Sequence, residues 1–250
     1  LKSNDEIKYL IVTALKNINY GDRGYYFINS NNGKAILFNK KSKLNENSNI
    51  WNLQDVKGSY IIQNQSKIAL SKKEGFLTNY FVKPDLTDKT QYPKLTYVKN
   101  FEPFNWHIGM GEYIDDMENE IKNDILTYIS TIRYGKDGYI FVNSLDKKAL
   151  VFDGKKLEKP KNYPNDALFE QQLEAVKNSY GNYFFYKFKK LNTQQEFPKM
   201  AYVIQYDKWK WIIGSGIYID EIDSELIKKE KIIKKMLITQ TNTLIAIIFF

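Results

Sequence analysis

The sequence predicts an α+β protein of two tandem modules, each a five-stranded antiparallel sheet with flanking helices, joined by long helices. Three observations predict this class. Four sequence blocks occur twice in the same order. A length of 250 residues suits two domains of about 100–120 residues better than one. Hydrophobic residues form 43% of the chain and aromatic residues 15%, which is enough to build packed cores.

The duplication is the strongest of these signals, because a repeat defines the architecture before any local pattern does. Residues 20–30 recur as 134–144, and residues 92–98 recur as 197–203. Tyr113, in the sequence Trp-His-Ile-Gly-Met-Gly-Glu-Tyr, has its counterpart at Tyr218. The separation of the copies falls from 114 to 105 residues along the chain, so the second copy has lost nine residues in its middle.

Each copy shows the same order of elements. An apolar stripe at a spacing of four residues (7, 11 and 15 in the first copy) predicts a leading helix. Alternating runs bounded by Gly, Asn and Asp predict the strands. In the first copy these cover 25–29, a short run ending at 38, 76–82, 94–101 and 105–111, and in the second 139–143, a run ending at 152, 182–188, 199–206 and 208–216. Helices are predicted at about 59–73 and 166–180, and longer ones leave the modules from 113 and 218.

The predicted boundaries are 1–116 for the first module, 117–223 for the second, and 224–250 for an exit helix that runs into a truncated transmembrane segment. From Leu244 on, this helix has no polar face, although a core helix normally keeps one. A membrane span needs about 20 apolar residues, so the run supplies only its first turns. No signal peptide precedes the leading helix, and we expect the sequence to begin inside a longer protein.

Composition argues against several functions. The net charge is +8, but the lysines are scattered and only Arg23 and Arg133 are arginines, so no nucleic-acid partner is expected. The absence of cysteine excludes disulfides and thiolate metal sites. His107 corresponds to Ile212 in the second copy, which indicates a packing position. No nucleophile elbow, phosphate-binding glycine loop or metal-spaced cluster occurs, so we expect neither an enzyme in this region nor a cofactor or metal.

Residues 132–142, 198–203 and 211–220 resemble the Cache superfamily of extracellular sensor domains, and the tandem arrangement resembles a double Cache region. The resemblance implies PAS-like modules in the periplasm or extracellular space, held at the inner membrane by flanking transmembrane helices. It also implies a small-molecule ligand, commonly a carboxylate or amino acid, and a cytoplasmic output such as a histidine kinase, chemoreceptor or diguanylate cyclase domain. Family members often carry His-Pro after the second strand, where this chain has Phe38-Asn39 and Phe152-Asp153.

A small anion binds where charged donors meet in an apolar or aromatic pocket. Arg133 suits a carboxylate clamp, and it suits a surface or interface arginine at a helix end equally well. Lys94 and Lys199 open equivalent strands and are either pocket cations or solvated lysines. An ideal strand places the tyrosine three residues after each lysine on the opposite face. Those tyrosines and the other aromatic ligand-binding candidates are Tyr25, Phe27, Trp51, Tyr80, Tyr97, Tyr139, Phe141 and Tyr202.

The choice of ligand module stays open, because the membrane-distal first module usually binds in double Cache receptors, whereas Arg133 points to the second. The exit helix runs without Pro or Gly from Tyr218, so we expect it to carry the signal and to pair with a second copy in a homodimer of the full-length receptor. A membrane-anchored or soluble solute-binding protein without signalling output is the alternative. A structural or adhesive module comes third.

Overall fold

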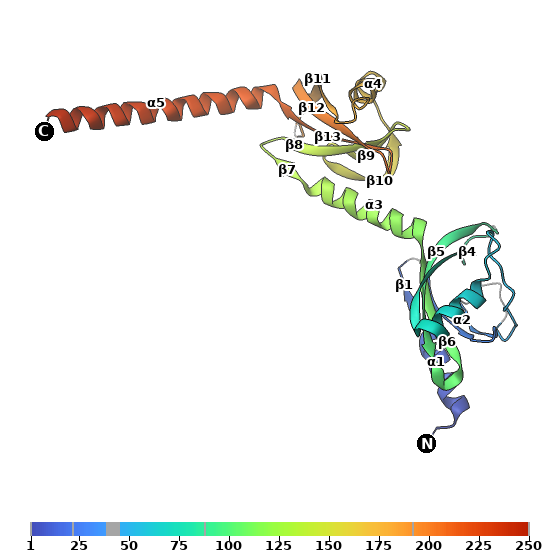
Figure 1. The fold of residues 1–250 in the computed structure, drawn as a ribbon. Coiled ribbons are helices and arrows are strands. Elements are labelled where there is room, and N and C mark those ends of the chain that lie inside the picture. The colour runs from blue at the N-terminus through green and yellow to red at the C-terminus, as the bar shows by residue number, and fades with distance from the viewer. Residues whose placement is uncertain (1, 22, 39–45, 88, 192, 250) are drawn as a thin grey trace. The chain divides into compact units, whose positions relative to one another are not determined.

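The structure, a computed structural model, describes residues 2–21, 23–38, 46–87, 89–191 and 193–249. Its internal contacts divide the chain into two units, residues 1–121 and 122–250, which we call module 1 and module 2. Each unit contains an antiparallel sheet with helices (Figure 1), so the predicted α+β class is confirmed.

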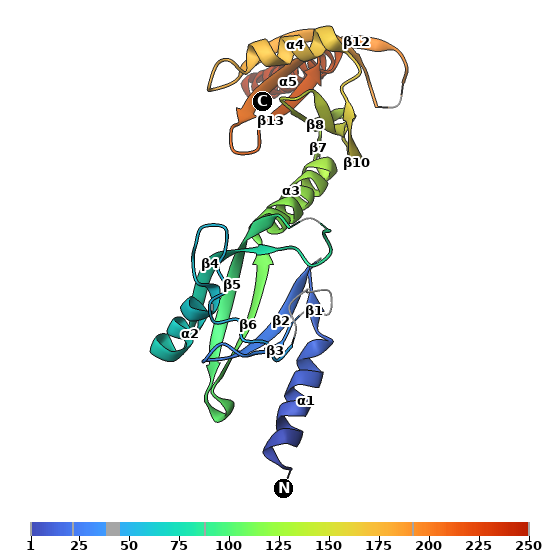
Figure 2. The same ribbon diagram turned by 90° about the vertical axis from the view of Figure 1, so that its right-hand side faces the viewer.

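The sheet of module 1 has the strand order β1-β2-β6-β5-β4, and β3 pairs with β2. The leading helix α1 (Asn4–Lys16) begins at a capping box in which Ser3 and Glu6 satisfy each other's backbone amides. Apolar residues of α1 pack against one face of this sheet, and α2 (Ile61–Lys72) covers the other (Figure 2). The strands are β1 (Asn19–Tyr20), β2 (Gly24–Ser30), β3 (Ala35–Leu37), β4 (Glu74–Val82), β5 (Gln91–Phe101) and β6 (Trp106–Tyr113), with a short 3-10 helix η1 (Glu102–Phe104) before β6.

The sheet of module 2 has the order β10-β9-β8-β13-β12-β11, and β7 pairs with β8. Helix α4 (Asp166–Ala175) covers the face that carries Tyr139 and Phe141. The second half of α3 (Ile114–Thr131) packs against the opposite face through Ile125 and Ile129. The strands are β7 (Arg133–Tyr134), β8 (Gly138–Ser144), β9 (Lys148–Phe152), β10 (Lys155–Asn162), β11 (Asn182–Lys189), β12 (Glu196–Tyr206) and β13 (Trp211–Tyr218).

The five predicted strands are present in each sheet, and the sequence patterns did not reveal β1, β7 and β10. The first two contain only two residues each. Strand β10 is almost entirely polar and contains Pro160, which normally argues against a strand. It is an edge strand whose register with β9 breaks between Lys156 and Lys161, so the proline needs no ladder partner.

Helices α3 and α5 (Ile219–Phe249) each follow the last strand of a sheet with no residue between. Among the residues that the structure describes, no helix combines the length and the apolar character that a membrane crossing requires. The apolar run that predicted a truncated span consists mostly of residues 245–250, whose side chains lie outside the described part of the chain.

Gly214 in β13 lies directly opposite Phe141, and its missing side chain makes room for that ring. A Cβ at this position would lie 2.2 Å from Cζ of Phe141. We therefore expect Gly214→Ala to destabilise module 2 by about 1–3 kcal/mol, the usual cost of overpacking a core. Urea unfolding checks this, with Lys187→Ala at an exposed position of the same sheet as control. An unchanged unfolding midpoint would show that the ring can move aside without cost.

Candidate functional site

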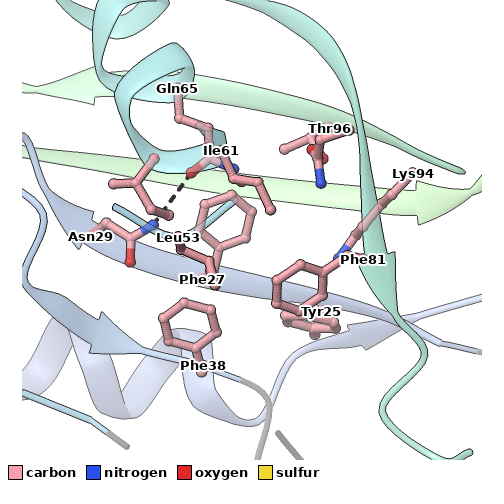
Figure 3. A pocket seen from close by; sticks show the side chains of 12 residues that line it. Tyr25, Phe27, Asn29, Phe38, Leu53, Ile61, Gln65, Phe81, Lys94 and Thr96 are labelled. Carbon is pink, nitrogen blue, oxygen red and sulfur yellow. Dashed lines mark hydrogen bonds between the residues drawn. The ribbon is translucent and has the colours of Figure 1, made fainter. Parts of the chain in front are cut away.

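Module 1 contains a pocket on the sheet face that α2 covers (Figure 3). Its interior measures about 20 Å³, and about 320 Å³ when the recess open to solvent is included. The interior alone holds a water molecule, so a ligand of several heavy atoms has to displace side chains toward the recess. The lining residues are Tyr25, Phe27, Asn29, Phe38, Leu53, Ile61, Ile62, Gln65, Asn79, Phe81, Lys94 and Thr96.

Lys94 is the charged residue of this pocket, and only 3% of its surface is exposed. Strand alternation places it on the same face of β5 as Thr96 and Val98. Its Nζ lies 4.0 Å from the ring centroid of Tyr25, 5.2 Å from that of Tyr113 and 5.8 Å from that of Phe81. Figure 3 shows the side chain reaching from β5 toward the first and last of these rings.

No carboxylate of the described residues forms an ion pair with Lys94; the ion pairs of module 1 join other groups. Burial lowers the pKa of Lys94 to about 7. The group is therefore divided between its charged and neutral forms near neutral pH. Aromatic faces attract an ammonium, but they do not replace a counter-charge.

Two polar side chains, Asn79 and Thr96, lie beside the lysine, and we call this pair the polar wall. Asn79 pairs with Lys94 across the β4–β5 ladder, and its Oδ1 accepts a hydrogen bond of 3.0 Å from Thr96 Oγ1. That bond orients the amide with Nδ2 on the side away from Thr96. The lysine ammonium and this amide are both hydrogen-bond donors, which is the combination that an anionic ligand requires.

The far end of the pocket is held by a buried network. Asn29 Nδ2 donates to Gln65 Oε1 at 3.3 Å (dashed in Figure 3) and lies 3.3 Å from His107 Nε2. His107 Nδ1 lies 2.9 Å from Asn31 Oδ1. Burial lowers the pKa of His107 to about 4, so the neutral ring donates from Nδ1 to Asn31 and accepts at Nε2. His107 is thus fully buried and orients pocket residues without lining the pocket.

Module 2 repeats the lysine arrangement around Lys199, which is fully buried. Its Nζ lies 4.0 Å from the ring centroid of Tyr139, 4.7 Å from that of Tyr218 and 5.6 Å from that of Phe188. This nitrogen has no hydrogen-bond partner among the described residues. Burial lowers the pKa of Lys199 to about 8, although three acidic side chains, Asp153 foremost, oppose the shift.

The two modules differ in the residue beside the lysine. Tyr186 pairs with Lys199 across the β11–β12 ladder, in the position that Asn79 has in module 1. Its ring stacks on Phe184 at a centroid distance of 5.1 Å and packs against the core under α4. Ala201 stands where module 1 has Thr96. An aromatic side chain therefore replaces the polar wall in module 2.

The other predicted residues lie away from both lysines. Arg133 is exposed, and its guanidinium donates to the backbone carbonyls of Ser130, Ile132 and Gly154 at 2.7–2.9 Å, where it caps the end of α3. Tyr97 and Tyr202 lie on the opposite sheet faces, as strand alternation predicts, and contact Phe76 and Tyr183.

Two aromatic candidates of module 1 also lie outside the pocket. Tyr80 alternates with the pocket residues Asn79 and Phe81, so its side chain leaves β4 on the other face. Trp51 lines a separate, shallow recess with four asparagines, Asn31, Asn32, Asn49 and Asn52. The structure therefore brings together Tyr25, Phe27 and Lys94 in module 1, and Tyr139, Phe141 and Lys199 in module 2.

Sequence reasoning missed the polar lining residues. Period-two alternation from Phe27 gives Asn29, and from Lys94 it gives Thr96, so both could have been found. Asn79 and Gln65 depend on strand pairing and on the position of α2. Within the part of the chain that the structure describes, no three His, Cys, Asp or Glu side chains gather as metal ligands.

Parts of the chain are similar to regions of known receptor proteins. The sensor histidine kinase MctS of Rhizobium johnstonii is 29% identical over 106 residues, which are 40% of this chain and 23% of MctS. The methyl-accepting chemotaxis protein CtpM of Pseudomonas aeruginosa is 28% identical over 153 residues, 56% of this chain and 26% of CtpM. The matches thus span about a quarter of the length of these relatives.

A crystal structure of a methyl-accepting chemotaxis protein from Vibrio parahaemolyticus is 29% identical, with a TM-score of 0.41, over 46% of this chain and 75% of that one. The family model dCache_2, described as "Cache domain", matches residues 1–223. Because that match includes both modules, the chain belongs to the Cache domain family, as the sequence motifs predicted.

Proposed function

We propose that the chain is the extracytoplasmic sensor region of a bacterial receptor and that module 1 binds a small monocarboxylate at Lys94. The observation that carries this proposal is a buried ammonium for which no described carboxylate is a partner. An unpaired buried charge is costly, and a bound carboxylate supplies the missing counter-charge through short, charge-assisted hydrogen bonds. The rings and aliphatic side chains of the pocket suit a short apolar tail.

The lining residues favour a carboxylate without an α-ammonium group over an amino acid. They include Lys94 and neutral amides and hydroxyls, and none of them is Asp or Glu. The ammonium of an amino acid would lose its hydration in this pocket and meet only neutral acceptors such as Asn29 and Gln65. A fatty acid of two to four carbons or a 2-oxo acid avoids this penalty.

Module 1 is the better candidate because Tyr186 replaces the polar wall of the second module. The same comparison supports a structural role for Lys199, enclosed by aromatic rings. The distal module is also the one expected to bind in a double Cache receptor.

The receptor role rests on membership of the Cache domain family and on the matched regions of a histidine kinase and a chemotaxis protein. In this proposal the protein is a homodimer in the inner membrane, this region lies in the periplasm or extracellular space, and α5 carries the signal to a cytoplasmic kinase, chemoreceptor or cyclase domain. A solute-binding protein without output would share the pocket but would lack such a domain in the full-length protein.

Calorimetric titration of the chain tests the ligand class and its pH dependence. Propionate and pyruvate are expected to bind. Propionamide should bind at least tenfold more weakly because it lacks the negative charge, and L-valine at least tenfold more weakly because its ammonium group finds no counter-charge in the pocket. Binding needs the protonated lysine, whose pKa is about 7. The affinity for propionate should therefore level off below about pH 6, fall to about half its maximum at pH 7, and decrease by nearly tenfold per pH unit above about pH 8. Equal binding of propionate and propionamide would contradict the proposal.

A further inference from the structure

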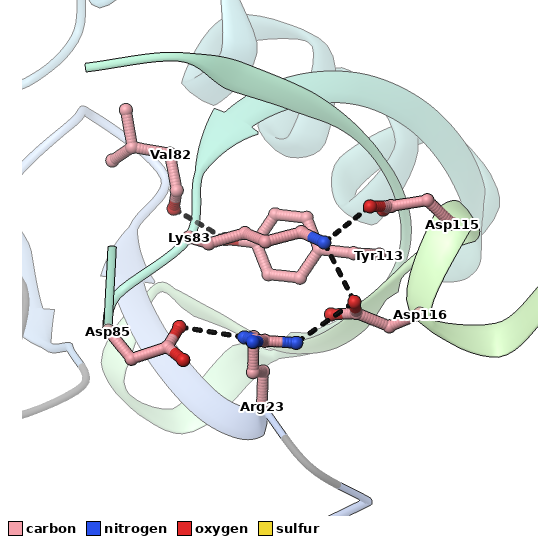
Figure 4. Close-up of polar contacts among 7 residues, drawn as sticks. All are labelled: Arg23, Val82, Lys83, Asp85, Tyr113, Asp115 and Asp116. Carbon is pink, nitrogen blue, oxygen red and sulfur yellow. Dashed lines mark hydrogen bonds and ion pairs between the residues drawn. The ribbon is translucent and has the colours of Figure 1, made fainter. Parts of the chain in front are cut away.

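A cluster of five charged residues holds the start of α3 to the rest of module 1 (Figure 4). Arg23 bonds Asp85 Oδ1 through Nε at 2.7 Å and Asp116 Oδ1 through Nη1 at 2.9 Å. Lys83 pairs with Asp115 and, at 2.7 Å, with the same Oδ1 of Asp116. We call these five residues the Lys83 cluster. The oxygen that two cations share lies in the first turn of α3, so the cluster joins that turn to the end of β4 and the start of β2.

The lysine at the centre of the Lys83 cluster is shielded from solvent, because its side chain is only 5% exposed. Burial alone would lower the pKa of Lys83, but Asp115 and Asp116 raise it on balance. The lysine therefore stays charged, and its position is tied to the two carboxylates that begin α3.

Tyr113 connects this cluster to the pocket lysine. It is the last residue of β6, directly before α3, and its side chain is buried. Its ring centroid lies 5.2 Å from Lys94 Nζ and 5.4 Å from Lys83 Nζ. Its hydroxyl donates to the carbonyl of Val82 at 2.5 Å, next to Lys83 in the chain. One rigid ring thus contacts the ammonium of the pocket and the ammonium of the cluster.

Module 2 contains the same connection. The ring of Tyr218 lies 4.7 Å from Lys199 Nζ and 5.1 Å from Lys190 Nζ, and its hydroxyl donates to the carbonyl of Lys189 at 2.6 Å. Lys190 in turn pairs with Asp220 at 2.6 Å in the first turn of α5. The connection recurs in a module that has Tyr186 beside its buried lysine in place of Asn79, so it belongs to the plan that the two modules share.

We propose that Tyr113 couples carboxylate binding at Lys94 to the Lys83 cluster, so that occupancy of the pocket tightens the attachment of α3. The inference rests on the proposed function of the same site. A bound carboxylate keeps Lys94 charged and in contact with the ring face, which strengthens the cation–π contact. The fixed ring and its hydroxyl then hold Val82 and Lys83 in the position that pairs with the α3 carboxylates.

Two measurements test the coupling, with propionate as the probe. In the unmodified chain, hydrogen exchange of the amides of residues 114–120 should slow about fivefold at saturating propionate. Because coupling is reciprocal, Asp116→Asn, which weakens the cluster outside the pocket, should weaken propionate binding about fivefold. The matched control is Glu221→Gln, the equivalent change in module 2, which should leave the affinity unchanged.

The outcomes separate the two proposals. If the unmodified chain binds no carboxylate, the proposed function and the coupling both fall. If propionate binds but exchange of residues 114–120 does not change, the coupling alone is overturned. The same conclusion follows if Asp116→Asn folds and binds propionate with unchanged affinity, or if Glu221→Gln weakens binding as much. The exchange measurement needs no variant, so a folding defect of Asp116→Asn leaves the test decisive.

Discussion

Replacement of Lys94 by methionine is expected to abolish propionate binding while stabilising module 1. Charge-assisted hydrogen bonds to a buried carboxylate contribute about 1.5–3 kcal/mol each, so losing one or two weakens binding by about tenfold at least and by about ten-thousandfold at most. Methionine has nearly the same length and fills the space among Tyr25, Phe81 and Tyr113 without a charge. Calorimetric titration and urea unfolding measure the two effects.

The stability gain should depend on pH in a defined direction. The folded-state pKa of Lys94 is about 7, against an ordinary value of 10.5. Between these values the unfolded chain holds a proton that the folded chain lacks, so wild-type stability rises with pH across this window. The cost of burying the group is fully present below pH 7, where it is about 5 kcal/mol, and it vanishes above about pH 10.5. Lys94→Met removes this rise.

Lys199→Met is the matched control, because it removes the equivalent buried lysine of module 2. It should also stabilise the chain, and it should remove a rise of stability with pH that begins near pH 8, the pKa of Lys199. Propionate binding should stay intact. Retained affinity in Lys94→Met, or lost affinity in Lys199→Met, would show that the ligand lies elsewhere.

Substitution of Asn79 by tyrosine should close the pocket of module 1 and reduce propionate binding below detection. The change places beside Lys94 the residue that stands beside Lys199. We expect the variant to fold, since module 2 accommodates a tyrosine at this ladder position next to a buried lysine. Titration measures binding, and circular dichroism with urea unfolding verifies the fold.

Thr78→Tyr provides the control for added bulk, because Thr78 is the neighbouring residue of β4 and is exposed on the other face. Its propionate affinity should match that of the unmodified chain. If Asn79→Tyr binds propionate normally, the ligand does not occupy the space beside Asn79, and the polar wall has no role in recognition.

Much of this architecture could be predicted from the sequence, because an internal repeat and the period-two pattern of strands are both visible in the order of the residues. The period of two correctly places Lys94 and Tyr97 on opposite faces of β5. It could not show that the Lys94 face is the one covered by α2, since coverage depends on a helix some thirty residues away in sequence. The burial that distinguishes a pocket cation from a solvated lysine is therefore a tertiary property.

Arg133 shows a different limit. Its residue type suited a ligand clamp and a surface or interface arginine at a helix end equally well, and the acceptors of its guanidinium are the carbonyls left free at the end of α3 and that of Gly154. Trp51 was a ligand-binding candidate, and it lines a recess of asparagines that is separate from the pocket. Residue type defined the available chemistry in both cases, and local backbone geometry decided where it was used.

The direct junction between β13 and α5 fixes the rotation of the helix about its axis relative to the strand. Tyr218 belongs to the sheet and Ile219 to the helix, so no flexible residue absorbs rotation between them. Each residue of an α-helix advances 1.5 Å and turns about 100°. The direction of each described α5 side chain, up to Leu244, is therefore set by the end of β13, and so is the face of the helix that a partner along this stretch contacts.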